Sequence, residues 1–248
     1  MRTSHVADEQ PTNAKHNAGF HLGRFLRNLA IVVALIGAGI WVWDQYVKDQ
    51  VIIRNYGVVT DGEIYRAGRQ SNRTMRKLHN QHDIKTIVDL GAFVRGSERE
   101  NQMEGIADEL GIERHRFDLE GDATGNPNDY VAALRLMADE SNYPMLVQCG
   151  AGAQRTTLAV LLYRRIVEGK SFEEAYPEAF KHEHDPEDDW ILLTYLAEHY
   201  DEIRTAFENE TWIEGYPLPR DYWVGGPEAD RAAAERDDDA APVSDDGA

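Results

Sequence analysis

The chain reads Cys149-Gly150-Ala151-Gly152-Ala153-Gln154-Arg155-Thr156 just after the apolar segment Tyr143-Pro144-Met145-Leu146-Val147. The apolar segment predicts a buried strand, and the glycine-rich run predicts a loop that leads from this strand into a helix. In such a loop the backbone N–H groups converge on one point, and the helix N-terminus adds positive potential there. The run therefore predicts a cradle for a phosphate group, formed by Gly150, Ala151, Gly152, Ala153, Gln154 and Arg155.

A single cysteine, Cys149, lies at the start of this cradle. The positive potential there favours the thiolate, which is the nucleophilic form of a cysteine. Arg155 brings a planar guanidinium that can bind two phosphoryl oxygens. Most lone cysteines are buried apolar residues, but the glycines and Arg155 favour a catalytic role. A sulfur-transfer or arsenate-reducing loop is a weaker alternative, because arsenate reduction usually needs further cysteines and the chain has none.

The run resembles the loop of the cysteine-dependent protein tyrosine and dual-specificity phosphatases, which reads His-Cys-x-x-Gly-x-x-Arg-Ser/Thr. Cys149, Gly152, Arg155 and Thr156 match this pattern, and the resemblance covers roughly residues 51–200. It implies that Cys149 forms a phosphocysteine intermediate and that Thr156 assists its turnover. It also implies an aspartic acid from another loop that protonates the leaving group. No cofactor is required by this chemistry.

Gln148 stands where the family has histidine, which helps to organise the loop and favours the thiolate. A glutamine can form hydrogen bonds but cannot carry charge. The alternative to an active enzyme is therefore a catalytically impaired module that binds phosphoproteins. Because both Cys149 and Arg155 are present, we expect the enzyme.

A second resemblance lies upstream, in Ile64-Tyr65-Arg66-Ala67-Gly68-Arg69-Gln70-Ser71. It is similar to the entry segment of bacterial and plant–fungal atypical dual-specificity phosphatases, where an aromatic–Arg–x–Gly–Gln stretch leads into the first helix. Arg69 interrupts the match between Gly68 and Gln70. Taken alone, the stretch is equally compatible with the edge of an ordinary hairpin.

The proton donor must be a carboxylic acid beside the cradle. One loop offers three acids, Asp118, Glu120 and Asp122. Asp122 precedes Gly125 and Pro127, which resembles the mobile acid loop of the family, and we take it as the first candidate. Asp118 is second, because it follows a strand at the more usual distance before the cysteine, and Glu120 is third. Acids in loops are also common simply as turn formers.

Strands and helices are expected to alternate along the rest of the domain. Besides the strand before Cys149, strands are expected at residues 51–53, 56–59, 63–66, 84–90 and 112–117, and helices at residues 72–82, 98–110, 129–139, 156–168, 172–180 and 188–207. This alternation predicts an α/β fold with a mainly parallel central sheet flanked by helices. Ligands bind at the carboxyl ends of such strands, where Cys149 falls.

Near the N-terminus, residues 29–43 form an uninterrupted apolar run. With its flanks it reaches the length of about 20 residues that a membrane span needs, and we expect a transmembrane anchor at residues 25–47. Arg24 and Arg27 precede the run and Asp44 and Asp49 follow it. The positive-inside rule then predicts a single-pass protein with a cytoplasmic N-terminus and an extracytoplasmic catalytic domain. A cleaved signal peptide and a buried core helix are the alternatives.

The 248 residues, 42% of them hydrophobic, suffice for one domain with extensions. We expect a disordered polar leader at 1–24, the phosphatase domain at 51–220 and a disordered acidic tail at 225–248. The net charge of −18 argues against nucleic acid or an anionic lipid surface as a partner. The stretch His182-Glu183-His184-Asp185 matches no zinc motif, and Asp185-Pro186-Glu187 predicts a helix start, so no metal is expected.

The expected substrate is a phosphorylated protein. No lysine lies between Cys149 and Arg155, whereas phosphoinositide-selective members of the family commonly place lysines there. The acidity of the chain would also repel a highly phosphorylated inositol. The expected partners are therefore a phosphoprotein and, through residues 25–47, the lipid bilayer.

Overall fold

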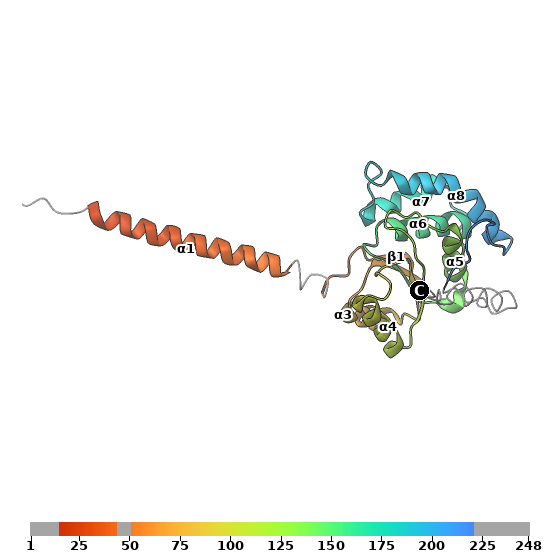
Figure 1. Ribbon diagram of the computed structural model, residues 1–248, viewed down its shortest axis with the longest axis horizontal. Coiled ribbons are helices and arrows are strands. Elements are labelled where there is room, and N and C mark those ends of the chain that lie inside the picture. The colour runs from red at the N-terminus through yellow and green to blue at the C-terminus, as the bar shows by residue number, and fades with distance from the viewer. Residues whose placement is uncertain (1–14, 44–50, 221–248) are drawn as a thin grey trace, which may run out of the picture. The chain divides into compact units, whose positions relative to one another are not determined.

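The computed structural model of the protein describes residues 15–43 and 51–220 (Figure 1). The described chain forms two separate units, the helix α1 (Lys15–Val42) and an α/β domain that begins after residue 48. The expected acidic tail at 225–248 lies outside the described residues, as do residues 1–14 of the expected leader and residues 44–47 of the expected anchor.

Helix α1 contains one stretch, Gly23–Val42, that is long and apolar enough to cross a membrane, with 20 residues and a mean hydropathy of 2.0. The helix starts at Lys15, within the polar leader expected at residues 1–24. A helix, once nucleated by its apolar segment, extends into flanking residues at little further cost.

The domain is built on one five-stranded sheet. Its strands are β1 (Gly57–Thr60), β2 (Ile64–Gly68), β3 (Thr86–Asp89), β4 (Glu113–Arg116) and β5 (Met145–Cys149). They lie in the order β1-β2-β5-β3-β4, and only β1 runs antiparallel to its neighbour. The expected α/β fold with a mainly parallel sheet is confirmed. Cys149 ends the central strand, at the edge where ligands bind in such sheets.

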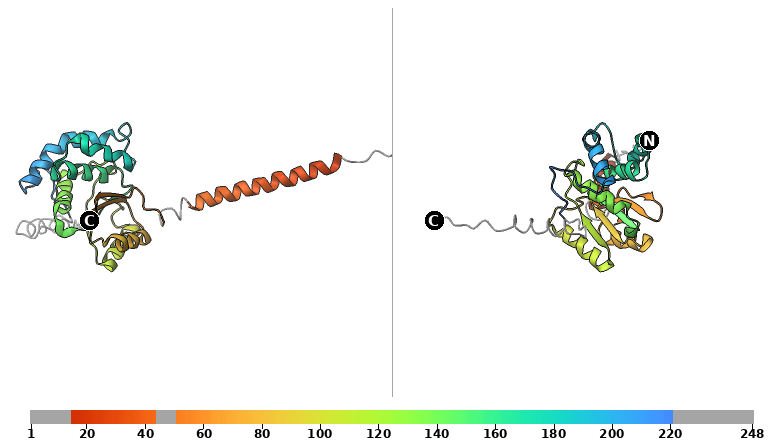
Figure 2. Two further views of the ribbon diagram at one scale, coloured as in Figure 1. Left: turned by 180° about the vertical axis from the view of Figure 1, so that it is seen from behind. Right: turned by 90° about the vertical axis from the view of Figure 1, so that its right-hand side faces the viewer.

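Helices cover both faces of the sheet (Figures 1 and 2). On one face lie α3 (Asn72–His82) and α4 (Glu98–Leu110), whose apolar side chains form one buried cluster with β2 and β3. The other face carries α5 (Pro127–Ala138), α6 (Gln154–Leu162), α8 (Trp190–Glu208) and the single turn α7 (Phe172–Ala175). The expected flanking helices are therefore present on both sides.

Local signals set the ends of α3 and α4. The Ser71 side chain accepts a hydrogen bond from the backbone N–H of Thr74, and the Thr74 hydroxyl bonds back to the Ser71 backbone. This reciprocal pair satisfies two donors at the helix start. Helix α4 ends at Gly111, which adopts the left-handed conformation that glycine tolerates best. Both boundaries agree with the expected ones.

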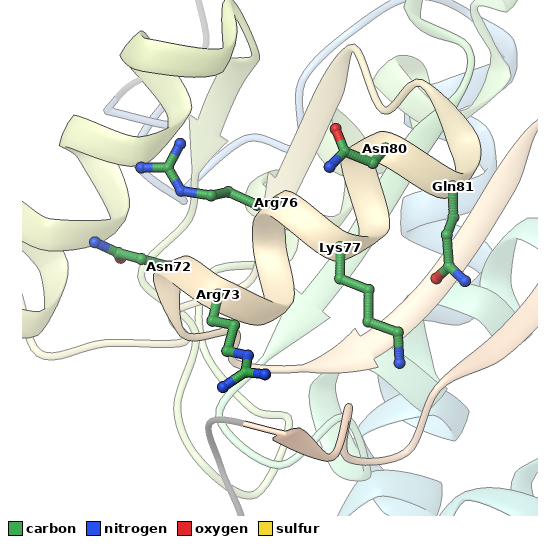
Figure 3. A pocket seen from close by; sticks show the side chains of 6 residues that line it. All are labelled: Asn72, Arg73, Arg76, Lys77, Asn80 and Gln81. Atoms are coloured by element: carbon green, nitrogen blue, oxygen red, sulfur yellow. The ribbon is translucent and has the colours of Figure 1, made fainter.

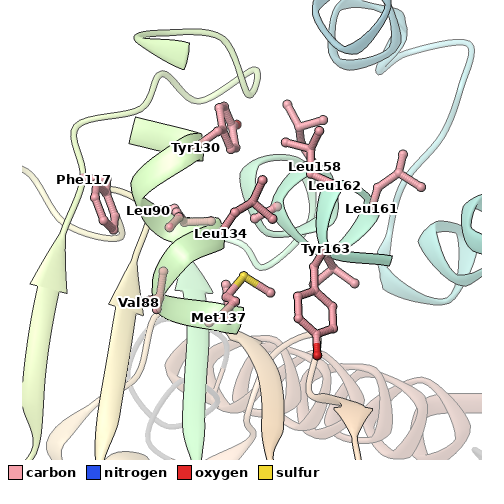
Figure 4. Close-up of a cluster of buried hydrophobic side chains, with 14 of the residues drawn as sticks. Val88, Leu90, Phe117, Tyr130, Leu134, Met137, Leu158, Leu161, Leu162 and Tyr163 are labelled. Atoms are coloured by element: carbon pink, nitrogen blue, oxygen red, sulfur yellow. The ribbon is translucent and has the colours of Figure 1, made fainter. Parts of the chain in front are cut away.

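The larger buried cluster fixes α6 behind the cysteine loop (Figure 4). Leu158 and Leu162 of α6 and Leu134 and Tyr130 of α5 are fully buried there. Burial of each such leucine contributes about 1.5–3 kcal/mol to stability. The start of α6, and with it the end of the loop, is thereby held in one position.

Several expected elements differ from the observed ones. Residues 51–53 form no strand, because β-branched residues favour strands only where a neighbouring strand can pair with them. The helix expected at 172–180 ends at Ala175 and continues as the 3-10 helix η4 (Tyr176–His182), since Pro177 lacks the N–H that an α-helix needs.

The helix expected at 188–207 is α8, which starts two residues later than expected, at Trp190. Residues 185–187 form a turn rather than a helix start, closed by the N–H of Asp189 on the Asp185 carbonyl at 2.7 Å. Helix α6 begins two residues earlier than expected and changes into the π-helical turn η3 (Tyr163–Val167). The expected boundaries of α5, β1, β2, β3 and β4 move by only one or two residues.

Candidate active site

Cys149 and the residues after it form a tight loop between β5 and α6. The Cys149 side chain is 2% exposed, and the backbone N–H of Gly152 donates a hydrogen bond to its Sγ at 3.2 Å. A donor aimed at sulfur favours the thiolate over the thiol. The loop therefore brings a backbone donor to the sulfur, and α6 begins a few residues further along the chain, at Gln154.

Two glycines allow this loop to lie against β2. Gly152 has φ +76°, and a Cβ there would come within 2.4 Å of the Gly68 backbone nitrogen. A Cβ on Gly68 would lie 2.8 Å from the Ala151 carbonyl oxygen. The Asn55 side chain donates to that same carbonyl at 3.0 Å. Any side chain at either glycine would push the loop away from the strand.

Arg155 reaches from the first turn of α6 to the ends of two neighbouring segments. Its Nη1 donates to the carbonyl oxygens of Leu90 at 2.9 Å, Gly91 at 2.5 Å and Leu119 at 3.0 Å. These bonds leave the rest of the guanidinium toward the loop, and a Cβ on Gly150 would lie 3.2 Å from Nη2. The buried Nε has no hydrogen-bond partner within residues 15–43 and 51–220. Arg155 is thus oriented, with a donor left for an oxygen ligand.

Gln148 is fully buried and links the cysteine strand to β3. Its Nε2 donates to Asp89 Oδ2 at 3.2 Å. Asp89 also accepts from Arg114 Nη2 at 2.8 Å and from the Ala92 N–H at 2.6 Å. Gln148 therefore ties the base of the loop to a buried ion pair on the neighbouring strands.

Sequence reasoning missed Asp89 and Arg114. The signal for Asp89 was an acid inside the otherwise apolar segment 84–90, because a buried carboxylate in a strand needs a partner. Nothing local marks Arg114 as that partner. It lies in β4, and only the sheet pairing of β3 with β4 brings the two together.

Asp122 lies in the loop between β4 and α5 and is exposed. It accepts hydrogen bonds from the Thr124 hydroxyl at 2.7 Å and the Thr124 N–H at 3.1 Å. These bonds lower the pKa of Asp122, and the positive charge of Arg155 lowers it further. The carboxylate therefore lies within electrostatic reach of the cradle.

Asp118 and Glu120 have other surroundings. Asp118 accepts a hydrogen bond from Arg95 Nη2 at 2.8 Å and forms an ion pair with Arg116 Nη2 at 3.0 Å, so two guanidinium groups hold its carboxylate. Glu120 is exposed, and its backbone N–H donates to the Thr124 carbonyl at 3.0 Å in the same turn. Asp118 is thus held by arginines, whereas the carboxylate of Asp122 is bonded to Thr124.

Three hydrogen bonds fix the backbone of this acid loop. Arg155 holds the Leu119 carbonyl, the Tyr130 hydroxyl donates to the Ala123 carbonyl at 2.8 Å, and the Tyr195 hydroxyl donates to the Gly125 carbonyl at 3.0 Å. Burial raises the pKa of Tyr130 well above its usual value, so this hydroxyl remains a donor at neutral pH. The loop is positioned by the cradle arginine on one side and by α5 and α8 on the other.

The histidines near residue 183 have partners within the fold. The His184 ring contacts the Tyr176 hydroxyl through Nε2 at 2.9 Å and the Asp189 carboxylate through Nδ1 at 3.3 Å. His182 packs against Gly57. In the described part of the chain no group of three or more His, Cys, Asp or Glu side chains is arranged around a common point. These residues serve the packing of η4.

A shallow hollow on the exposed side of α3 is separate from the cysteine loop (Figure 3). It is lined by Asn72, Arg73, Arg76, Lys77, Asn80 and Gln81. Arg76 is engaged with Glu109 of α4. No cysteine and no acid lines this hollow.

A comparison with models of protein families identifies the family of the chain. The sequence model described as the tyrosine phosphatase family matches residues 50–188, which is more than half of the chain. The chain belongs to the tyrosine phosphatase family. This confirms the resemblance found in the cysteine loop. A search of curated proteins found no match.

Solved structures agree on the fold. The Siw14 catalytic core, from S. cerevisiae, is 21% identical with a TM-score of 0.50 over 65% of this chain and 98% of that one. P. aeruginosa TpbA is 21% identical with a TM-score of 0.50 over 63% of this chain and 92% of that one. A TpbA variant in complex with phosphotyrosine gives the same identity and score, over 66% and 95%.

Proposed function

We propose that the protein hydrolyses phosphate monoesters through a phosphocysteine intermediate on Cys149. The thiolate Sγ attacks phosphorus, the bond from phosphorus to the ester oxygen breaks, and that oxygen takes a proton from Asp122. A water molecule then attacks the phosphocysteine while Asp122 takes back a proton. Inorganic phosphate and the Cys149 thiolate are released, so no cofactor is consumed.

The observation that carries this proposal is the arrangement around the sulfur. Gly152 N–H donates to Cys149 Sγ at 3.2 Å, and Arg155 is held by three carbonyls with its buried Nε unpartnered. Donors that are already in place for a developing anion stabilise it without reorganisation. A phosphoryl group between the sulfur and Arg155 would supply the missing acceptor.

Thr156 fits a role in turnover. The residue is fully buried at the first turn of α6, and its hydroxyl has no hydrogen-bond partner within the described ranges. An unpaired buried hydroxyl is costly. The role implied by the family, a donor to the leaving sulfur when phosphocysteine is hydrolysed, would give this hydroxyl a partner.

Asp122 is our proposed acid. Its carboxylate accepts hydrogen bonds from Thr124, and its electrostatic coupling to Arg155 supports a position near the cradle. Asp118, in contrast, would have to give up its arginine partners before it could donate a proton. We therefore prefer Asp122 to Asp118, because its carboxylate can donate a proton without first breaking contacts to arginine.

Asp122→Asn is expected to lower kcat about 10²- to 10⁴-fold with alkyl or simple aryl phosphates. The pKa of Asp122 is lowered, so the carboxyl loses its proton already below neutral pH. Above that pKa the proton-donating fraction falls tenfold per pH unit, so wild-type kcat should rise as pH falls. The rise should be absent in Asp122→Asn. Steady-state kinetics of the full chain in detergent against pH tests this.

Asp118→Asn is the matched control for the same kinetics. It removes one carboxylate four residues away and should change kcat far less. A larger loss in Asp118→Asn than in Asp122→Asn would reassign the acid to Asp118.

We propose phosphorylated proteins as the substrates. Siw14 is described as a PP-IP phosphatase and TpbA was solved with phosphotyrosine, so the fold serves different substrates. The choice for this chain rests on its own charges. Its cradle has no lysine, and its net charge of −18 disfavours polyanionic ligands. A single phosphoryl group on a protein places the least negative charge against this surface.

We further propose that α1 anchors the enzyme in a membrane with the catalytic domain on the extracytoplasmic side. The length and apolarity of Gly23–Val42 support this, as do the basic residues before it. The full chain is expected to stay in the membrane fraction after alkaline carbonate extraction, and a chain without residues 1–47 to leave it. A mature protein whose N-terminus lies after residue 43 would instead show a cleaved signal.

A further inference from the structure

Arg66, on β2, is a buried cation directly beside the cysteine loop. Its side chain is 1% exposed. Its Nη2 donates to the Gly152 carbonyl and to the Thr157 hydroxyl, both at 2.8 Å. Gly152 is the same residue whose N–H faces the Cys149 sulfur. Arg66 therefore holds the loop and the first turn of α6 together at the nucleophile.

Arg66 lacks the partner that a buried charge ordinarily has. Within the described residues no carboxylate lies at ion-pair distance from it, and its buried Nε has no hydrogen-bond partner. Glu178 contributes an attractive charge, but its carboxylate is bonded to Arg164 at 3.1 Å. A buried guanidinium without a paired carboxylate is unfavourable unless another anion compensates it.

The compensating anion is available in the loop. Burial lowers the pKa of Arg66 to about 10, and the negative charge of Cys149 acts against this lowering. At neutral pH Arg66 is therefore still a cation. Arg66 is bonded to the carbonyl of Gly152, whose N–H contacts the sulfur, so its positive charge lies beside the loop that would hold a thiolate. The neutral Gln148 side chain cannot contribute in this way.

We propose that Arg66 is a positioning residue that supplies, from behind the loop, the positive charge that the chain lacks at Gln148. It holds the Gly152 carbonyl so that the Gly152 N–H faces the sulfur, and it stabilises the thiolate electrostatically. The inference deepens the proposed function, since it rests on Cys149 acting as a thiolate nucleophile. It also gives a role to the entry segment 64–71.

Other charged or titratable groups also face Arg66 and Cys149. On the side of Arg66 lie Arg164, Glu178 and His182, and burial together with Arg66 lowers the pKa of His182, which keeps it neutral near pH 7. On the side of the cradle lie Arg155, Asp122 and Tyr130. Arg164 is already paired with carboxylates. Of the charged groups named here, Arg66 and Arg155 are the cations without a carboxylate partner beside the loop.

The test is the pH dependence of Cys149 alkylation by iodoacetamide in the full-length protein in detergent. Cys149 is the sole thiol, so the reaction reports it alone. Arg66→Gln keeps a donor but removes the charge, and its profile should move to higher pH by about one unit, a tenfold loss of reactive thiolate at fixed low pH. Arg66→Lys keeps the charge and should move much less. Each variant is measured below its melting transition.

Arg164→Gln is the matched control, because it removes a neighbouring, carboxylate-paired arginine and should leave the profile at its wild-type position. Equal shifts in Arg66→Gln and Arg66→Lys, or no shift in either, would overturn the proposal. The assay needs no turnover. A wild type that hydrolyses nothing, but whose profile moves with the charge at residue 66, would refute the proposed function and keep this inference.

Discussion

Cys149→Ser is expected to lower kcat for an aryl phosphate by roughly four to six orders of magnitude. The serine hydroxyl is a weak nucleophile unless an adjacent base activates it. The residue beside it, Gln148, is no base and is bonded to Asp89. The Gly152 N–H and the N-terminus of α6 create a positive potential that favours a thiolate. This potential cannot ionise a serine hydroxyl to the same extent. Stopped-time assays of released phosphate on wild type and variant measure the ratio.

Phosphopeptide binding provides the control for this variant. The cradle donors and Arg155 are unchanged by the substitution, so Cys149→Ser should bind a phosphopeptide about as well as the wild type does. Turnover within tenfold of wild type would rule out Cys149 as the nucleophile. Binding without turnover in the wild type as well would favour the phosphoprotein-binding module.

Arg155→Lys is expected to lower kcat/KM by about 10³-fold or more, the range seen when a transition-state arginine is removed. The guanidinium can bind three backbone carbonyls through Nη1 and still offer Nε to a phosphoryl oxygen. An ammonium is a single point of charge and cannot do both. The loss should fall mainly on kcat, because the charge on the phosphoryl oxygens is best matched by the planar fork in the transition state.

Arg76→Lys is the control for that experiment. Arg76 lies on the exposed side of α3 and is bonded to Glu109, so its replacement should leave kcat/KM unchanged. The same substitution is thereby tested at a site without catalytic contacts. An Arg155→Lys enzyme with wild-type kcat and only a raised KM would mean that Arg155 binds substrate but does not act in the transition state.

The features of the fold that sequence predicted correctly depend on local signals. The Ser71 capping box and Gly111 mark helix ends by residues a few positions apart, and both ends were found at those residues. The strand, loop and helix around Cys149 follow from one continuous run. The strand that was expected and not found failed for a non-local reason. Residues 51–53 have strand propensity, but no neighbouring strand is placed to pair with them.

The residues of the candidate site also divide into those indicated by a local motif and those brought together only by the folded sheet. Cys149 and Arg155 lie in one motif, so their spacing alone indicated a phosphate cradle. The contacts of Arg66 and Asp89 depend on strands that meet only in the folded sheet. The choice between Asp122 and Asp118 likewise depends on Arg95 and on β4, which hold Asp118. Such partners leave no signature near the residue itself.

Detection of the phosphocysteine tests most directly whether Cys149 is the nucleophile. Wild type and Cys149→Ser are mixed with a phosphopeptide, quenched in acid within the first turnover and digested for mass spectrometry. We expect one phosphoryl group on the wild-type peptide that contains Cys149, at a level that falls as substrate is exhausted, and none in the variant. Hydrolysis by the wild type with no phosphoryl group on Cys149, or with one on another residue, would contradict this expectation.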